Sequence, residues 1–442
     1  MKKIKNKYIN IICKMSFHIL MNYLVITLFE VLDKAIVGNY SVYDFAAVGI
    51  GSAVIYKITG SLGVISAAYN IIAAKYQGKN DKNKFNRTFY TVMFFSIIIG
   101  IFIIVLSLIG GRVLFLKIFG LDGKILTVCL EYFYISSITV LLNLIIFNFS
   151  AYFRNLKNTK ISFYSTLIST IINVIFDYLF VYGKFGFPEL GAKGAAVGSV
   201  LGLLSGISVY LVKLDRNIDI KFKSRVSKSI MKKLVKLYIP LLGQDIIEGT
   251  IFAILLTGIV SRLGVYDIAA FNLSESIGSI ISLPIYAFST AAVTLAIQKS
   301  FAEENNNSKK IINTSIILAL TSVLIIGILI SIFPNAIFGL ITKDKNIILK
   351  VSKIFIMVVI VQIFNIFNQI YKGYLQGLNN ERFVFKYTTL VSFISIVWIT
   401  VLAIKLKLLG VYIGLVINNL ILSLIYYLKI NRDNCKETLY KI

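Results

Sequence analysis

The stretch that decides the fold is VMFFSIIIGIFIIVLSLIG, residues Val92–Gly110. It contains no charged residue, and a helix of ~20 such residues, rising ~1.5 Å per residue, crosses a hydrocarbon layer roughly 30 Å thick. A second run of this kind, Ile311–Phe333, lies in the other half of the chain. Both runs therefore indicate helices that span a membrane rather than helices of a soluble core.

The composition of the whole chain agrees with a membrane environment. Of its 442 residues, 57% are hydrophobic and 15% are charged, against about 25% charged residues in soluble domains. Apolar stretches between charged or turn-rich segments predict twelve spans. They lie at 16–38, 46–72, 88–110, 125–150, 161–182, 190–212, 236–260, 268–297, 311–333, 347–373, 384–406 and 408–429.

A longer polar segment, rich in Lys and Arg, separates the first six spans from the last six. It runs from Lys213 to Lys236. We therefore expect an all-α integral membrane protein with a six-helix lobe at 1–212, a basic cytoplasmic linker at 213–235 and a second six-helix lobe at 236–442.

The basic residues predict the orientation of the chain. If the N-terminus is cytoplasmic, most of the 46 Lys and Arg residues fall in the tails and in the even-numbered connections, as the positive-inside rule requires. We expect a multi-pass protein of the bacterial inner membrane with both termini in the cytoplasm. The net charge of +26 then encodes orientation, and no nucleic-acid partner is expected.

An internal repeat relates the two halves. VYDFAA at residues 42–47 returns as VYDIAA at residues 265–270, and YFRNL at 152–156 is echoed by YLQGL at 374–378. The two offsets agree within one residue. Because each half contains an even number of spans, both halves have the same orientation, which predicts parallel repeats around a pseudo-symmetry axis and a cavity between two lobes.

We single out four acidic residues within the predicted spans, where each charge costs at least a few kcal/mol. They are Glu30, Asp33, Asp177 and Glu248. Helix rise places Asp33 and Asp177 each about 24 Å above the inner end of its span. Two carboxyl groups at equal depth in one lobe can share a proton or a cation, although a plain ion pair with a nearby base is the alternative for each acid.

Two polar residues extend this candidate site. Asn173 lies four residues before Asp177, on the same helix face, and Ser199 falls roughly 13 Å below the outer end of the sixth span. An amide oxygen and a hydroxyl suit Na⁺ as well as a proton relay. The residue types leave the choice between the two ions open.

Other function classes are not favoured by the residues present. A Walker-type loop ending in Gly-Lys-Ser/Thr is absent, so nucleotide hydrolysis is not expected to drive transport. The single histidine and the three cysteines, Cys13, Cys129 and Cys435, form no metal-ligand or disulfide pattern. We expect neither an enzyme nor a removable signal peptide, no cofactor, and no metal other than Na⁺ at the coupling site.

Several motifs resemble the multidrug and toxic compound extrusion (MATE) family over nearly the whole chain. The first span contains VLDKAIVG at 31–38, followed by AAVG at 46–49 and QGKND at 77–81. The fifth and sixth spans contain NVIFDYLF at 173–180 and LGAKGAAVGS at 190–199. The resemblance implies a V-shaped pair of six-helix bundles that exports organic cations in exchange for H⁺ or Na⁺.

The resemblance also implies a cation site in the first lobe. The family residues that match Asp33, Asn173, Asp177 and Ser199 form it, although threonine is usual at the last position. In the second lobe, Glu248, eight residues after a proline, resembles the seventh-span glutamate of some members. Their tenth-span acid falls on Asn365, so Glu248 and Asn365 are candidates for a second substrate or cation site.

We therefore expect a monomeric secondary antiporter that exports organic cations or xenobiotics across the bilayer in exchange for H⁺ or Na⁺ by alternating access. The alternative is a flippase or exporter of a lipid-linked or specialised endogenous metabolite. That alternative requires basic residues facing the central cavity, and few basic residues fall within the spans.

Overall fold

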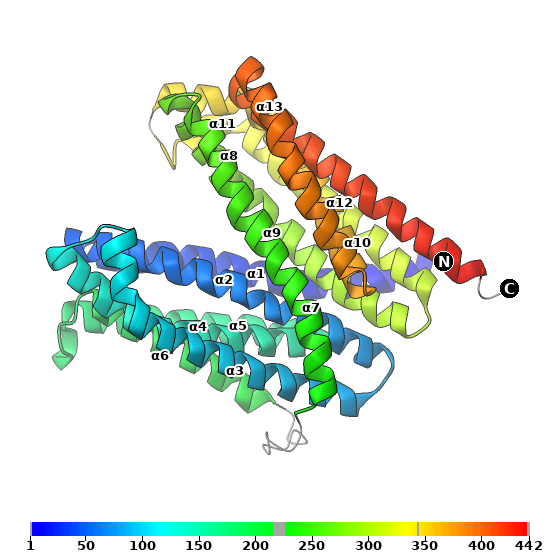
Figure 1. The fold of residues 1–442 in the computed structure, drawn as a ribbon, viewed down its shortest axis with the longest axis horizontal. Helices are drawn as coiled ribbons and strands as arrows, with labels where there is room; N and C mark the ends of the chain where they lie inside the picture. The colour runs from blue at the N-terminus through cyan, green and yellow to red at the C-terminus, as the bar shows by residue number, and fades with distance from the viewer. Residues whose placement is uncertain (1, 215–225, 343, 440–442) are drawn as a thin grey trace. The chain divides into compact units, whose positions relative to one another are not determined.

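The computed structural model describes residues 2–214, 226–342 and 344–439, and Figure 1 shows the course of its helices. The chain divides into two compact units. Unit N comprises residues 17–238, and unit C comprises residues 239–442 together with 1–16. The boundary at Tyr238 falls inside a helix, and residues 215–225 of the predicted linker lie outside the described part of the chain.

Unit N is built from the first six long helices. These are α1 (Lys2–Gly38, which begins in unit C), α2 (Val42–Gly78), α3 (Lys82–Val113, continued by a π-helical turn at Leu114–Ile118), α4 (Gly123–Asn155), α5 (Thr159–Tyr182) and α6 (Ala192–Lys213). Within unit N, α2 packs on α4, and α5 packs along α6. Most of these helices are longer than the predicted spans because hydropathy marks only the part inside the hydrocarbon layer.

Unit C contains the remaining helices. These are α7 (Lys228–Ile246, which begins in unit N), a π-helical turn (Ile247–Ile251), α8 (Phe252–Ser261), α9 (Val265–Phe301), α10 (Asn305–Ile332), the short α11 (Pro334–Phe338), α12 (Lys345–Gly377) and α13 (Glu381–Leu439). Helix α9 packs on α10 and α12, and α12 packs on α13. Helix α7, the π-helical turn and α8 follow one another without a break, as a single span.

Eleven helices within the described ranges are long and apolar enough to cross a membrane, and the last of them is a hairpin. In α13 the backbone reverses at Lys407, which has φ 50° and ψ −135°. The indole Nε1 of Trp398 donates to the carbonyl oxygen of Gly414 at 3.2 Å, and the hydroxyls of Thr388 and Tyr426 are hydrogen-bonded. The two arms are therefore antiparallel spans, which confirms the predicted all-α membrane fold of twelve spans.

The repeated motifs occupy equivalent places in the two units. Asp44 lies in the first turn of α2, and Asp267 lies in the first turn of α9. Their partners differ, however. The Oδ1 atom of Asp44 accepts a hydrogen bond from the backbone N–H of Ala192 at 2.8 Å, whereas Asp267 forms an ion pair with Lys350 at 2.8 Å.

The carboxylate of Asp44 caps the N-terminus of α6, so we expect Asp44→Ala to destabilise unit N. Loss of an acceptor for an otherwise unpaired N-terminal N–H costs typically about 1 kcal/mol. Thermal unfolding of the purified protein measures this loss. Asp122→Ala is the matched control, because Asp122 precedes α4 but makes no capping hydrogen bond; equal losses in the two variants would contradict the capping role.

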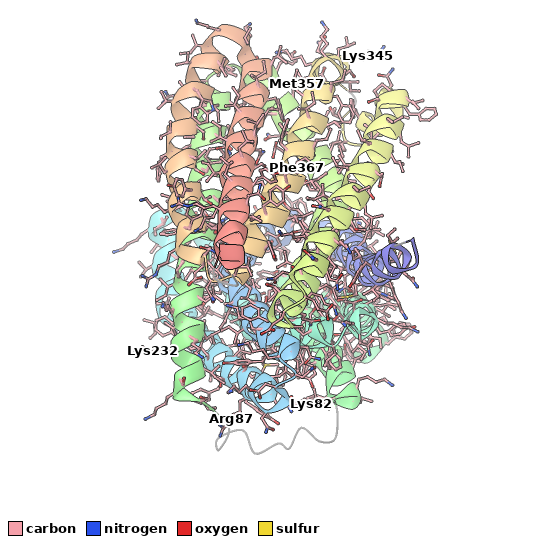
Figure 2. All side chains as sticks on the ribbon, turned by 90° about the vertical axis from the view of Figure 1, so that its right-hand side faces the viewer. Lys82, Arg87, Lys232, Lys345, Met357 and Phe367 are labelled. Carbon is pink, nitrogen blue, oxygen red and sulfur yellow. The ribbon has the colours of Figure 1, made fainter. Side chains whose placement is uncertain are left out.

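Basic side chains gather at one end of unit N. Lys82 and Arg87 lie near the start of α3, and Lys232 lies near the start of α7 (Figure 2). Lys233 Nζ donates to the hydroxyl of Tyr76, near the end of α2, at 3.4 Å, so these helix ends lie together. Basic residues at one end of a membrane bundle are the pattern that the expected cytoplasmic orientation requires.

Candidate functional site

Glycines bring α5 and α6 into close contact where the candidate site lies. They recur every fourth residue along α6, at Gly194, Gly198, Gly202 and Gly206. A Cβ atom at Gly198 would lie 2.0 Å from Oδ1 and 2.8 Å from the backbone nitrogen of Asp177. At Gly202 it would lie 2.6 Å from the carbonyl oxygen of Ser169. Only glycine allows this approach, which encloses Asp177 between the two helices.

The carboxyl group of Asp177 is completely buried, with 0% of the residue exposed. The amide Nδ2 of Asn173 donates to its Oδ2 at 2.9 Å. The same Nδ2 lies 3.3 Å from the hydroxyl oxygen of Ser199 on α6. The structure thus brings Asn173, Asp177 and Ser199 together in one hydrogen-bonded cluster.

Helix α1 brings Asp33 to this cluster. Asp33 and Asp177 lie close enough for a hydrogen bond between their carboxyl groups. One turn further along each helix, the hydroxyl of Tyr182 donates to the carbonyl oxygen of Ile36 at 2.8 Å, which fixes α1 against α5. The side chain of Glu30, the other acid of this span, lies outside the described residues.

The four side chains present oxygen atoms together with the amide NH₂ group of Asn173. Asn173, Asp33 and Tyr132 contact Asp177 or influence it electrostatically, and none of these three groups is basic. Two adjacent buried carboxyl groups cannot both be ionised without a compensating positive charge. The donor set fits a proton held between the carboxyl groups or a hard cation such as Na⁺ bound by their oxygens.

Tyr132 on α4 is a neighbour of the site that the sequence did not single out. It is 7% exposed, and its ring packs in an apolar cluster with Val37 of α1 and Val181 of α5. Its hydroxyl lies within electrostatic reach of both Asp33 and Asp177. One tyrosine among the 25 in the chain carries no sequence signal for this position.

In unit C, the structure places Glu248 and Asn365 in separate networks. Glu248 accepts from Lys372 Nζ at 3.1 Å through Oε2 and at 3.3 Å through Oε1. Asn365 instead donates to Gln362 at 3.1 Å and accepts from Gln369 at 3.3 Å. Lys372 is a further residue that the sequence did not single out.

Glu275 on α9 is a further acid within a spanning helix. It lies inside the predicted span 268–297, so the rule that identified the other four acids also applies to it. The hydroxyl of Tyr412 is 3.5 Å from its Oε1 atom. Unit C therefore contains acids in two of its spanning helices, Asp245 and Glu248 in one and Glu275 in the other.

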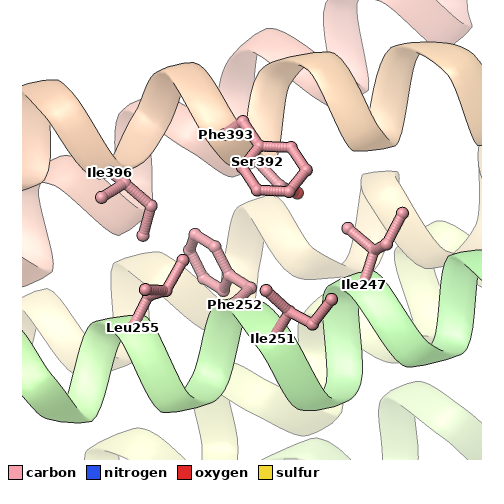
Figure 3. A pocket seen from close by; sticks show the side chains of 7 residues that line it. All are labelled: Ile247, Ile251, Phe252, Leu255, Ser392, Phe393 and Ile396. Carbon is pink, nitrogen blue, oxygen red and sulfur yellow. The ribbon is translucent and has the colours of Figure 1, made fainter.

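An apolar crevice lies beside the π-helical turn in unit C (Figure 3). Six apolar side chains and one serine line it: Ile247, Ile251, Phe252, Leu255, Ser392, Phe393 and Ile396. Its lining contains no charged group, and its free space is too narrow for a water molecule. We therefore do not assign a cation to it.

The family model MatE matches residues 18–179 and 240–425. "Probable multidrug resistance protein NorM" of Photorhabdus laumondii is 26% identical over 377 residues, covering 84% of this chain and 82% of that protein. The protein of the same name from Thermotoga maritima is 23% identical over 401 residues, covering 88% of this chain and 85% of that protein. The residues matched by the family model include five of the six candidate site residues, and Ser199 lies outside them.

The likeness extends to solved structures. A MATE structure in the bent conformation covers 98% of both chains with a TM-score of 0.85 at 18% sequence identity, which establishes the shared fold. The family match, which covers most of both halves, establishes more than the fold. The chain belongs to the MATE family of multidrug efflux transporters.

Proposed function

We propose that the chain is a secondary active antiporter that exports organic cations or xenobiotics in exchange for H⁺ or Na⁺ by alternating access. The observation that carries this proposal is the pair of carboxyl groups of Asp33 and Asp177, held beside each other in a buried cluster. Isolated membrane acids without a functional role are rare because their desolvation is costly.

The cluster links ion occupancy to conformation through its charge. Without a proton or Na⁺ the buried carboxyl groups repel each other, and an arrangement that admits water is favoured. With the ion bound, the closed arrangement around Asn173, Asp177 and Ser199 is stabilised. An ion that stabilises one arrangement more than the other shifts the equilibrium by that difference in binding free energy, and an ion gradient then drives export.

The proposed orientation has both termini in the cytoplasm of a bacterial cell. It rests on the distribution of Lys and Arg along the chain, and the matched relatives come from bacteria. We propose an organic cation as the substrate because of the multidrug resistance that the relatives' names describe.

Transport by the purified protein in liposomes tests this function. A pH gradient and a Na⁺ gradient are imposed separately, and the movement of a fluorescent organic cation is followed. We expect one of the two gradients to drive uphill movement, and an ionophore for that ion to abolish it. Movement that is equal with and without either gradient would overturn the antiport proposal.

A further inference from the structure

The ion pair of Glu248 and Lys372 lies where α7 departs from regular helical geometry. Glu248 belongs to the π-helical turn Ile247–Ile251, and Pro240 lies two turns earlier in α7. An inserted π turn rotates the side chains that follow it and is frequent at functional sites. In this unit it directs Glu248 toward Lys372 on α12, 124 residues further along the chain.

Donors within the protein surround the carboxylate of Glu248. Lys372 Nζ contacts both oxygens, at 3.1 and 3.3 Å, and Gln244 Nε2 donates to Oε2 at 3.1 Å. Gln244 is itself fixed, because its Oε1 accepts from Gln376 Nε2 at 2.8 Å. The Lys372 side chain is 13% exposed and that of Glu248 is 29% exposed, so the pair is largely withdrawn from solvent.

The charge balance at Glu248 is therefore opposite to that at Asp177. At Asp177 the amide of Asn173 and the carboxyl group of Asp33 supply no positive charge, and a mobile proton or cation can supply it. At Glu248 the compensating charge is an ammonium group attached to the chain. A second cation at Glu248 would meet the repulsion of Lys372 at close range.

We propose that Lys372 is a built-in counter-cation that occupies the place of a mobile ion at Glu248, so that Glu248 takes up neither H⁺ nor Na⁺ during transport. The inference rests on the proposed antiport, since it states that the coupling ion of that antiport does not bind at Glu248. It concerns Glu248 alone and leaves Glu275 on α9 a separate acid.

The groups that face Glu248 come from three elements. Lys372 approaches from α12, Tyr426 of α13 lies within electrostatic reach, and Asp245 precedes it on α7. Lys372 is the cation among these groups. Its removal takes the ammonium group away from Glu248, while the other groups named here, Gln244, Tyr426 and Asp245, supply no positive charge.

The thermal stability of the detergent-purified full-length protein tests this role without a transport measurement. Lys372→Met removes the charge and keeps the length of the side chain, Lys372→Arg keeps the charge, and the double variant Glu248→Gln/Lys372→Met removes both charges. Each melting temperature is measured in acidic and in alkaline buffer, with Na⁺ or with choline at equal ionic strength.

We expect the melting temperature of Lys372→Met to lie several degrees below that of the wild type in alkaline choline buffer. In acid or with Na⁺ this difference should disappear, because a proton or Na⁺ then takes the place of the ammonium group. The double variant should lose this recovery, and Lys372→Arg should behave as the wild type. A decrease in the melting temperature of Lys372→Met that is the same in all four buffers would overturn the proposal. So would a Na⁺ stabilisation of the wild type that Glu248→Gln abolishes.

These outcomes are separable from those of the antiport proposal. Liposomes that show no gradient-driven movement would contradict antiport and leave the melting data unchanged. Conversely, gradient-driven antiport combined with Na⁺ binding at Glu248 of the wild type would contradict only the role of Lys372.

Discussion

Asp177→Asn is expected to reduce gradient-driven export by about tenfold or more while the protein stays folded. The amide has the shape of the carboxyl group, and its oxygen can still accept the hydrogen bond from Asn173. It has no negative charge to hold a proton or Na⁺. A loss of about 1.4 kcal/mol in ion binding reduces affinity tenfold. Removal of one member of a buried pair of opposite charges, here the carboxylate that holds the ion, commonly costs about 2–5 kcal/mol.

Two measurements separate lost coupling from lost folding in this variant. Thermal unfolding should remain close to that of the wild type, and the variant should bind the organic cation with an affinity that no longer responds to pH or Na⁺. Asp122→Asn is the matched control, because Asp122 is exposed at the start of α4 and makes no capping hydrogen bond. If the Asp177→Asn variant exported the organic cation at the wild-type rate under the driving gradient, this result would contradict the proposed site.

Much of the candidate site in unit N follows from the sequence because its geometry is local or periodic. Asn173 and Asp177 share a helix face through their spacing of four residues. In the structure Asn173 Nδ2 lies 2.9 Å from Asp177 Oδ2. Asp33 could be placed at the depth of Asp177 because both spans enter from the same side. The pairing of α1 with α5 did not follow from depth, since depth does not say which helices are neighbours.

The contact between Glu248 and Lys372 could not be predicted by such reasoning. It joins helices 124 residues apart in sequence, and the π-helical turn at Glu248 changes the register that regular helical spacing assumes. Lys372 lies near the end of α12 (Lys345–Gly377), where a base commonly serves as an interfacial anchor. Its position in sequence therefore suggested no partner.

In the fold, too, the local sequence predicted some features and not others. Hydropathy located the twelve spans, because a hydrocarbon layer imposes a minimum apolar length. It did not locate the helix ends, since several helices continue beyond the apolar stretch; α2 and α9 each contain 37 residues. The reversal at Lys407 depends on the backbone of a single residue with positive φ, while the spans on either side were already evident.

Gly198→Ala is expected to disrupt the site and to destabilise unit N. The added methyl would lie 2.0 Å from Oδ1 and 2.8 Å from the backbone nitrogen of Asp177. The side chain of Asp177 can rotate, but the backbone contact is relieved only if α5 moves away from α6. Overpacking of this kind costs typically about 1–3 kcal/mol, and the displacement also separates Asn173 and Asp177 from Ser199. Both the melting temperature and gradient-driven export should fall.

Two further glycine variants test whether the close contact between α5 and α6 at Gly198 causes the expected losses of stability and export. Gly60→Ala on α2 adds the same methyl where no atom lies within 4 Å, so stability and export should be unchanged or slightly improved. At Gly206→Ala the nearest atom is 3.0 Å away, on Ser169. This contact loosens the α5–α6 interface two turns from Asp177, so stability should fall slightly and export should persist. If Gly198→Ala also exported at the wild-type rate, helix contact would not be what holds Asp177 in its coupling position.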